Sequence, residues 1–373
     1  MTNSIAKSLV TDSLQKIGIE INGTRPSDIQ VHNEDFYARL VREGSLGLGE
    51  MYMDGWWDSA ALDVFFDRLI RADLESQIKK NNRLLFKALI AKLINLQPKK
   101  RAFQVGKTHY DLGNNLFKAT LDPSMSYTCG YWKEAKNLEE AQQAKLKLVC
   151  QKLKLQPGMR ILDIGCGFGA LAKYAAETYG VSVVGITVSK NQFEYAKQNC
   201  TGLPIEIRYQ DYREMKEKFD RVVSLGMFEH VGHLNHRHYM QIVSTCLSEG
   251  ALFLLHTIGS NKTVFQADEW ITKYIFSTGM LPSIAQIGKA SEDFFIMEDW
   301  QNFGAYYDNT LMAWNENFTK NWPNLKKEYD ERFYRMWRYY LLLCAGGFRA
   351  RGMQLWQIVF SKGGIKGVYQ APR

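Results

Sequence analysis

The second half of the chain alternates short apolar runs with longer amphipathic segments. Five runs, each bounded by turn residues, have the length and β-branched content of buried strands. They cover residues 160–165, 182–187, 205–211, 219–226 and 251–258. Helical periods lie between the first three runs, at 170–180 and 189–200. Because strands that alternate with helices at this spacing form parallel sheets, the pattern predicts a doubly wound α/β fold.

The residues around this region have mostly helical patterns. Helices are expected over residues 138–155 and about 325–345, and the latter precedes a last strand at 355–362. Near the N-terminus, a Gly- and Trp-rich stretch at 45–58 predicts a turn between helices. A proline and a charge cluster at 96–103 mark the best linker candidate. The predicted parts are a smaller helical N-terminal domain at 1–95, a linker at 96–106 and a catalytic domain at 107–373.

The charge of the chain indicates the kind of partner that it binds. The 373 residues carry a formal net charge of +8, which favours an acidic partner such as nucleic acid or anionic lipid. Between Arg71 and Arg101, nine Lys and Arg residues are balanced only by Asp73 and Glu75. Leucines are interleaved with them, as in a basic amphipathic helix at a membrane surface or in a linker. A solvated face on a helix packed against its own domain explains the same pattern.

Targeting signals and disulfides are not indicated. No apolar run approaches the roughly 18 residues that span a bilayer, and the first 18 residues lack the apolar core of a secretory signal. The six cysteines have no paired spacing, as expected for reduced thiols in the cytosol.

The first strand leads into a glycine-rich loop. Gly165, Gly167 and Gly169 allow a tight turn and close approach of a ligand at a helix N-terminus. The loop alone also fits a dinucleotide site or a merely tight turn. Asp163, two residues before the first glycine, favours S-adenosylmethionine, because an acid suits the cationic amino-acid end of that ligand and would repel a pyrophosphate.

The next two strand ends supply further candidates. A dinucleotide site expects an acid after the second strand, where Thr187 and Gln192 stand instead. Many methyltransferases also have an acid there, so these two residues would have to hold the ribose in its place. After the third strand, Asp211 and Tyr212 occupy positions suited to the adenine amino group and ring face.

Eight motifs then occur in the order found in cyclopropane fatty acid synthases. They are "YDLGNNLF", "SYTCGYWKEA", "LDIGCGFGALAKYAA", "GITVSKNQ", "SLGMFEHVG", "LHTIGS", "FGAYYDNTLMAW" and "FRARGMQLWQIVF". The match includes "GSLGLGEMYMDGWW" near the N-terminus and covers nearly the whole chain. The sequence therefore resembles the bacterial two-domain members of this family, which belongs to the mycolic acid cyclopropane synthase superfamily.

The resemblance implies a Rossmann-like fold and a reaction. These enzymes transfer a methyl group from S-adenosylmethionine to a cis double bond of a phospholipid acyl chain. A carbocation forms, and a proton is then lost from the new methyl group as the cyclopropane ring closes. The implied base is a bound bicarbonate ion. The implied partners are a bilayer surface at the inner face of the cell membrane and a second copy of the chain in a homodimer.

The resemblance also assigns residues. The positions that match the bicarbonate ligands are Cys129, Glu229, His256, Tyr307 and the backbone of Ile258. Tyr127 and Thr128 match contacts to the methionine end of the cofactor, which places "SYTCGYW" over the site as a lid. Direct methyl transfer needs no nucleophilic cysteine, so Cys129 is expected to help position the anion.

Other interpretations stay open at this stage. Taken singly, His256 and Tyr307 are more often packed core residues than ligands. His233, His236 and His238 lack a fourth metal ligand and fit a solvated loop and helix start better. A related lipid methyltransferase that closes no ring fits the same fold, and an inactive lipid-binding protein is disfavoured by the complete ligand set. A nucleic-acid methyltransferase would suit the charge, but the sequence has no base-flipping motif.

Overall fold

The computed structural model describes residues 3–72, 113–265, 267–277 and 279–373. Its centre is a sheet with strand order β5-β4-β3-β6-β7-β9-β8. The strands are β3 (Arg160–Ile164), β4 (Ser182–Thr187), β5 (Ile205–Tyr209), β6 (Phe219–Leu225), β7 (Leu247–Gly259), β8 (Ile296–Asn302) and β9 (Gln354–Ser361). The first five strands pair in parallel, and β9 joins β7 and β8 antiparallel. The predicted doubly wound α/β fold is confirmed.

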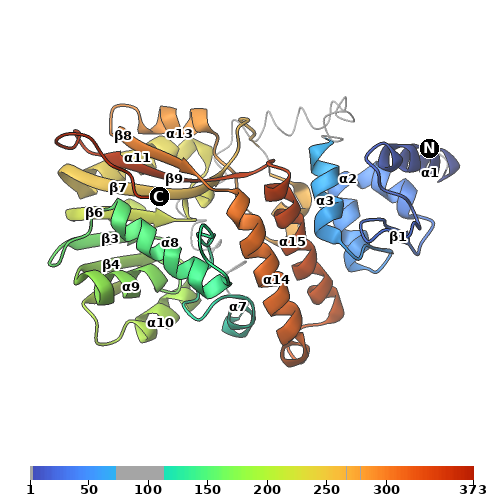
Figure 1. Ribbon diagram of the computed structural model, residues 1–373, viewed down its shortest axis with the longest axis horizontal. Helices are drawn as coiled ribbons and strands as arrows, with labels where there is room; N and C mark the ends of the chain where they lie inside the picture. Colours follow the sequence, from blue (N-terminus) through green and yellow to red (C-terminus); the bar gives the residue numbers. More distant parts are fainter. Residues whose placement is uncertain (1–2, 73–112, 266, 278) are drawn as a thin grey trace.

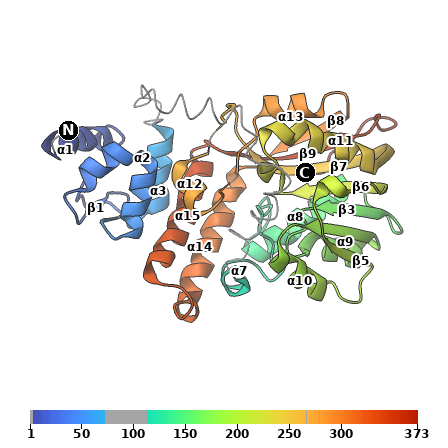
Figure 2. The same ribbon diagram turned by 180° about the vertical axis from the view of Figure 1, so that it is seen from behind.

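Helices cover both faces of this sheet. One face packs against α8 (Leu138–Lys152) and α9 (Ala170–Tyr179), which are in front of the sheet in Figure 1. The opposite face packs against α11 (His236–Cys246) and α13 (Ile284–Ser291), which are nearer the viewer in Figure 2. The helix α10 (Lys190–Asn199) follows β4. The predicted helices and strands of this region are confirmed to within a few residues at their ends, apart from β7, which starts earlier.

A third core joins the N-terminal region to the long C-terminal helices. It contains α1 (Asn3–Gln15), α2 (Phe36–Met53), α3 (Leu62–Arg71), α7 (Asn114–Thr120), α12 (Glu269–Tyr274), α14 (Ala305–Leu325) and α15 (Glu331–Arg349). The short strands β1 (Gln30–Val31) and β2 (Trp57–Asp58) pair beside α2. Figure 1 shows α14 and α15 between the sheet and the N-terminal helices. The N-terminal region is therefore joined to the rest of the chain mainly through α15, and also through α12.

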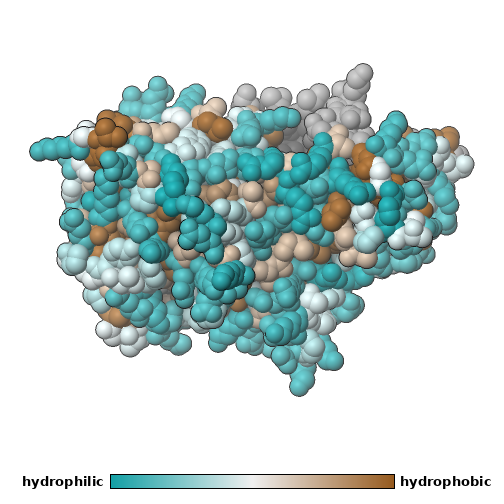
Figure 3. Space-filling model, viewed as in Figure 1, coloured by the Kyte–Doolittle hydropathy of each residue, from teal (hydrophilic) through white to brown (hydrophobic). Residues whose placement is uncertain are grey.

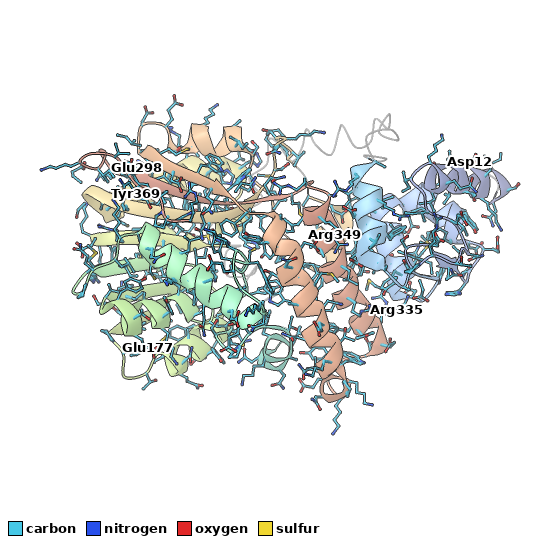
Figure 4. The ribbon with its side chains drawn as sticks, viewed as in Figure 1. Asp12, Glu177, Glu298, Arg335, Arg349 and Tyr369 are labelled. Atoms are coloured by element: carbon cyan, nitrogen blue, oxygen red, sulfur yellow. The ribbon has the colours of Figure 1, made fainter. Side chains whose placement is uncertain are left out.

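Arginines of α15 add polar contacts to this interface. Arg335 donates to the Tyr52 carbonyl and to Asp58, and Arg349 bridges Asp63 of α3 and Asp308 of α14. Figure 4 labels both arginines on α15, near the N-terminal helices. The described part of the predicted N-terminal domain is helical as expected. Its remainder, the predicted linker and most of the basic stretch lie outside the described residues, so the domain boundaries stay predictions.

Two sequence predictions were wrong. The stretch 45–58 is not mainly a turn, because α2 continues to Met53 and is kinked earlier, at Gly44. Within the helix Gly49 serves packing instead: a Cβ on it would lie 2.3 Å from the Trp270 ring. The helical stretch at 325–345 is divided between α14 and α15, because the chain leaves the helix between Leu325 and Glu331. The mostly polar edge strand β8 was not predicted.

The outer surface gives no sign of a membrane span. Among the described residues, no helix combines the length and apolar character needed to cross a bilayer. The face shown in Figure 3 is largely hydrophilic, with small separate hydrophobic spots.

We predict that Gly346→Ala weakens the packing of α3 on α15. The new Cβ would lie 2.6 Å from the Phe66 Cβ and 2.8 Å from the Asp63 carbonyl, so the helices must move apart. Such overpacking costs about 1–3 kcal/mol, and the melting temperature should fall by several degrees. Gly288→Ala on α13 is the matched control, because its Cβ meets nothing within 4 Å and removes a helical glycine. Equal melting temperatures for the two variants would contradict the prediction.

Candidate active site

A cavity opens at the carboxyl ends of β3, β4 and β6, where ligands bind in sheets of this kind. The nine residues predicted to bind the cofactor all line it. They are Tyr127, Thr128, Asp163, Gly165, Gly167, Thr187, Gln192, Asp211 and Tyr212. The parallel strands explain most of the convergence, because the residues from Asp163 to Tyr212 follow or end β3, β4 and β5, whereas Tyr127 and Thr128 come from the loop before α8. That these residues bind S-adenosylmethionine stays a prediction.

The glycine loop provides room at the cavity wall. Gly165 and Gly167 have φ values of +82° and +56°, which side-chain-bearing residues rarely adopt. A Cβ on Gly165 would also lie 2.8 Å from Met227, whereas one on Gly167 would meet nothing within 4 Å. The backbone of this loop is therefore exposed to whatever occupies the cavity. Cys166 is buried and burial raises the pKa of its thiol well above 9, so it is an inert small side chain.

Asp163 is the acid of this wall. It is the fourth residue of β3 and is almost completely buried, and burial raises the pKa of its carboxyl to about 7. The positive charge of Lys145 partly opposes that rise. A carboxylate that is costly to keep charged in the protein alone is well suited to a cationic ligand group.

The predicted ribose and adenine residues are held in defined positions. The Thr187 hydroxyl donates to Gln192 Oε1 at 3.0 Å, so these side chains act as one unit at the end of β4. Asp211 forms an ion pair with Arg213 at 2.9 Å. The Tyr212 ring packs against Tyr239 with a centroid separation of 5.1 Å. These contacts fix the wall on which an adenosine group would lie.

The loop "SYTCGYW" is anchored from several sides. The Tyr127 hydroxyl lies 3.0 Å from that of Tyr340, and Thr128 Oγ1 accepts a hydrogen bond from Lys145 Nζ at 2.9 Å. Thr310 Oγ1 accepts from the Gly130 backbone N–H and from the Trp132 indole N–H, at 3.1 and 2.8 Å. The loop is thus tied to α8, α14 and α15.

A second group of polar residues lies between the cavity and the aromatic core. Glu229 follows β6 in the short helix η2 (Phe228–His230), and its Oε1 accepts from the Ile258 N–H at 2.6 Å. Burial raises the pKa of Glu229 to about 7, and the Ile258 N–H partly opposes this. Its other oxygen, Oε2, is buried without a hydrogen-bond partner among the described residues. The Ile258 N–H therefore orients Glu229, and a direct contact of Ile258 with an anion stays a prediction.

His256 is the second member of this group. It lies on β7, and burial lowers its pKa well below 6.5, so the ring is neutral. Its Nδ1 lies 3.3 Å from Gln357 Nε2. In this amide orientation Nδ1 accepts, and Nε2 carries the proton. Nε2 is buried without a hydrogen-bond partner in the described part of the chain, so it is an available donor.

Cys129 and Tyr307 complete the group. The Cys129 thiol is fully buried and donates to the Gly130 carbonyl at 3.2 Å, and burial raises its pKa far above the usual range. Burial also raises the pKa of Tyr307 well above 10. Both side chains are therefore protonated donors at neutral pH.

Sequence analysis missed two residues of the site and misplaced one. Lys145 lies on the cavity wall, and Thr310 supports the lid loop. The sequence does indicate Lys145, because this charged residue occupies a position on the apolar face of the helix predicted at 138–155. His236 was expected in a solvated segment but is buried and stacked on Phe228 at 4.3 Å. No group of three candidate metal ligands is found in the described ranges.

Comparisons with known proteins place the chain in a family. The family model "Mycolic acid cyclopropane synthetase" matches residues 97–358. The chain belongs to this family. A cyclopropane-fatty-acyl-phospholipid synthase of Escherichia coli K12 is 56% identical over 355 residues, covering 95% of this chain and 93% of that relative.

Solved structures agree with this assignment. The cyclopropane synthase MmaA2 of Mycobacterium tuberculosis is 32% identical and has a TM-score of 0.67, covering 72% of this chain and 100% of its own. The mycolic acid cyclopropane synthase CmaA1, solved with S-adenosylhomocysteine (SAH) and CTAB, gives the same identity and TM-score, covering 72% of this chain and 99% of its own. Together with the family match, these findings establish the chain as an S-adenosylmethionine-dependent methyltransferase of the cyclopropane synthase family.

Proposed function

We propose that the protein transfers a methylene group from S-adenosylmethionine to the cis double bond of phospholipid acyl chains and so forms a cyclopropane ring. The family and the E. coli relative support the activity. The observation that carries the ring-closing step is the pair of buried, unsatisfied atoms Glu229 Oε2 and His256 Nε2. A methyl transfer without ring closure must also lose a proton, so the lipid product decides between the two reactions.

The proposed chemistry begins with an alkene, which is a weak nucleophile, and a sulfonium methyl, which is a strong electrophile. The new C–C bond forms as the S–C bond breaks, and the positive charge passes to the acyl chain. Aromatic faces stabilise such a cation by roughly 0.5–2 kcal/mol each. Tyr307 packs on Phe348 and Trp314, with centroid separations of 4.6 and 6.0 Å, so aromatic side chains gather beside the polar group. Loss of a proton from the new methyl group then closes the ring.

Bicarbonate fits the polar group as the base for that proton. An anion with one O–H can donate to Glu229 Oε2 and accept from His256 Nε2, and both atoms lack other partners in the described structure. Tyr307 and Cys129 are further donors of the same neighbourhood. When bound, bicarbonate would supply a proton acceptor inside a water-poor site. Glu229 would orient it and increase its basicity through the shared hydrogen bond.

A bilayer surface is proposed as the partner, because the acyl substrate resides there. The basic stretch that first indicated it lies outside the described residues. Leu234, Val264 and Ile284 are instead exposed by 48%, 44% and 47%. Their segments meet, since Thr263 and Ser283 hydroxyls lie 2.7 Å apart and the His233 ring contacts Phe265 at 5.1 Å.

This apolar patch, Leu234, Val264 and Ile284, is connected to the candidate site. The Met280 N–H donates to the Glu229 carbonyl at 3.0 Å, and the Ser260 N–H donates to the Pro282 carbonyl. Exposed apolar side chains beside a site for acyl chains favour docking on the membrane. We therefore propose peripheral association with the inner face of the cell membrane. The homodimer implied by the resemblance stays a prediction.

The first test is the product. Purified protein, S-adenosylmethionine and vesicles of unsaturated phospholipid should yield acyl chains heavier by one CH2 that have lost the double bond. Mass spectrometry of the lipids measures the added CH2, and proton NMR distinguishes the cyclopropane ring from a methylated alkene, which has the same mass. A methylated product that keeps its unsaturation would support the alternative lipid methyltransferase, and the absence of any product would overturn the proposal.

We predict that Glu229 controls kcat and the pH below which kcat falls. Because the pKa of Glu229 is raised to about 7 and its carboxylate must accept the hydrogen bond of bicarbonate, turnover should fall as pH drops below about 7. The measurement is kcat at saturating S-adenosylmethionine, which separates this effect from protonation of Asp163. Glu229→Gln should lower kcat about 100-fold or more. Its affinity for SAH should stay within about threefold of the unmodified protein, and unchanged turnover would remove Glu229 from the mechanism.

The apolar patch should contribute to membrane binding. Replacing Leu234 and Ile284 by Asp in one variant removes two apolar contacts, each worth about 1–2 kcal/mol if it inserts, and should weaken vesicle cosedimentation at least tenfold. Val368→Asp is the matched control, because Val368 is 86% exposed on the C-terminal segment away from the patch. Equal binding by the two variants would exclude the patch as the docking surface.

A further inference from the structure

Lys145 is a buried cation on the wall of the cofactor cavity. It lies in the middle of α8, a helix that packs on the sheet, and only 1% of its surface is exposed. Burial of an ammonium group is costly unless hydrogen bonds or an opposite charge compensate. The groups that contact the Lys145 ammonium therefore show whether its charge is fully compensated within the protein.

The described residues compensate this charge only in part. Among the described residues, the ammonium group makes one hydrogen bond, to Thr128 Oγ1 at 2.9 Å, although it has three protons to donate. The nearby carboxylate of Asp122 is engaged by the Ser124 hydroxyl and by the backbone of Ser124 and Ser126. Burial lowers the pKa of Lys145 to about 8, and the charge of Asp122 only partly opposes this. An anionic partner supplied by a ligand would complete the site.

Asp163 lies on the same cavity wall and carries the opposite charge. Lys145 and Asp163 interact electrostatically, yet they come from different elements, α8 and β3. The cavity thus presents one buried acid and one buried base side by side. The methionine end of S-adenosylmethionine has the complementary pair, an ammonium group and a carboxylate, both attached to its α-carbon atom.

We propose that Lys145 binds the carboxylate of the methionine end of S-adenosylmethionine, while Asp163 receives its ammonium group. Thr128 then holds the Lys145 ammonium in place and links its position to the lid loop. This assignment rests on the use of S-adenosylmethionine and not on ring closure. Its failure is therefore distinguishable from failure of the proposed reaction, which the lipid product tests separately.

Three ligands separate binding of the carboxylate from a merely structural role. SAH has the whole amino-acid end, its decarboxylated analogue lacks only the carboxylate, and 5′-methylthioadenosine lacks the entire end. Lys145→Met should raise the Kd of SAH about 10- to 100-fold, as expected for a lost charge-assisted hydrogen bond. The Kd values of the other two ligands should change less than about threefold. Isothermal titration calorimetry measures all three.

Lys152→Met is the matched control. Lys152 lies two turns further along α8, is 0% exposed, and bonds to Gln301 at 2.6 Å without lining the cavity. It should leave all three affinities unchanged. Should Lys145→Met fail to fold, as judged by its melting transition, Lys145→Gln provides the same loss of charge. Equal weakening of all three ligands would show that Lys145 only supports the lid, and an unchanged Kd for SAH would also overturn the proposal.

Discussion

The register of β6 on β7 determines where the polar groups of the site lie. Leu225 pairs with His256, and the next residue, Gly226, donates its N–H to the His256 carbonyl at 2.9 Å. Three residues later Glu229 accepts the N–H of Ile258, two residues beyond His256. A shift of this register by one residue would turn His256 to the other face of the sheet. Backbone pairing therefore fixes the strand that carries the imidazole and the N–H that orients the carboxylate.

The site divides into a charged compartment and a neutral one. Asp163 and Lys145 face the cavity that would hold the cofactor, where opposite charges are useful. Glu229, His256, Cys129 and Tyr307 lie behind it among aromatic rings, and burial favours the uncharged form of each. A compartment of neutral donors with one readily protonated acid would disturb the proposed carbocation little. The same compartment could still hold the proposed anion.

Features of the fold and the site could be predicted from the sequence where they depend on local patterns. Parallel strands and glycine turns are local patterns, so the sheet and seven of the nine cavity residues could be predicted together, whereas Tyr127 and Thr128 were assigned by the resemblance. Gly49 of α2 could not be interpreted correctly, because it makes room for Trp270, which is more than two hundred residues away. Thr310 was missed for a similar reason: a threonine in a helix gives no indication that it accepts hydrogen bonds from a distant loop. The resemblance, and not spacing, identified Cys129 and Tyr307.

The burial and contacts of Cys129 in the lid loop determine its role. A nucleophilic thiol requires a lowered pKa and an adjacent base, but Cys129 is completely buried and its pKa is raised. Its sulfur donates to the Gly130 carbonyl and lies 3.8 Å from the Thr310 hydroxyl. Both contacts fix the backbone of the loop that also carries Tyr127 and Thr128. Cys129 is therefore best understood as a positioning residue, through which the cofactor wall and the proposed anion site share one rigid segment.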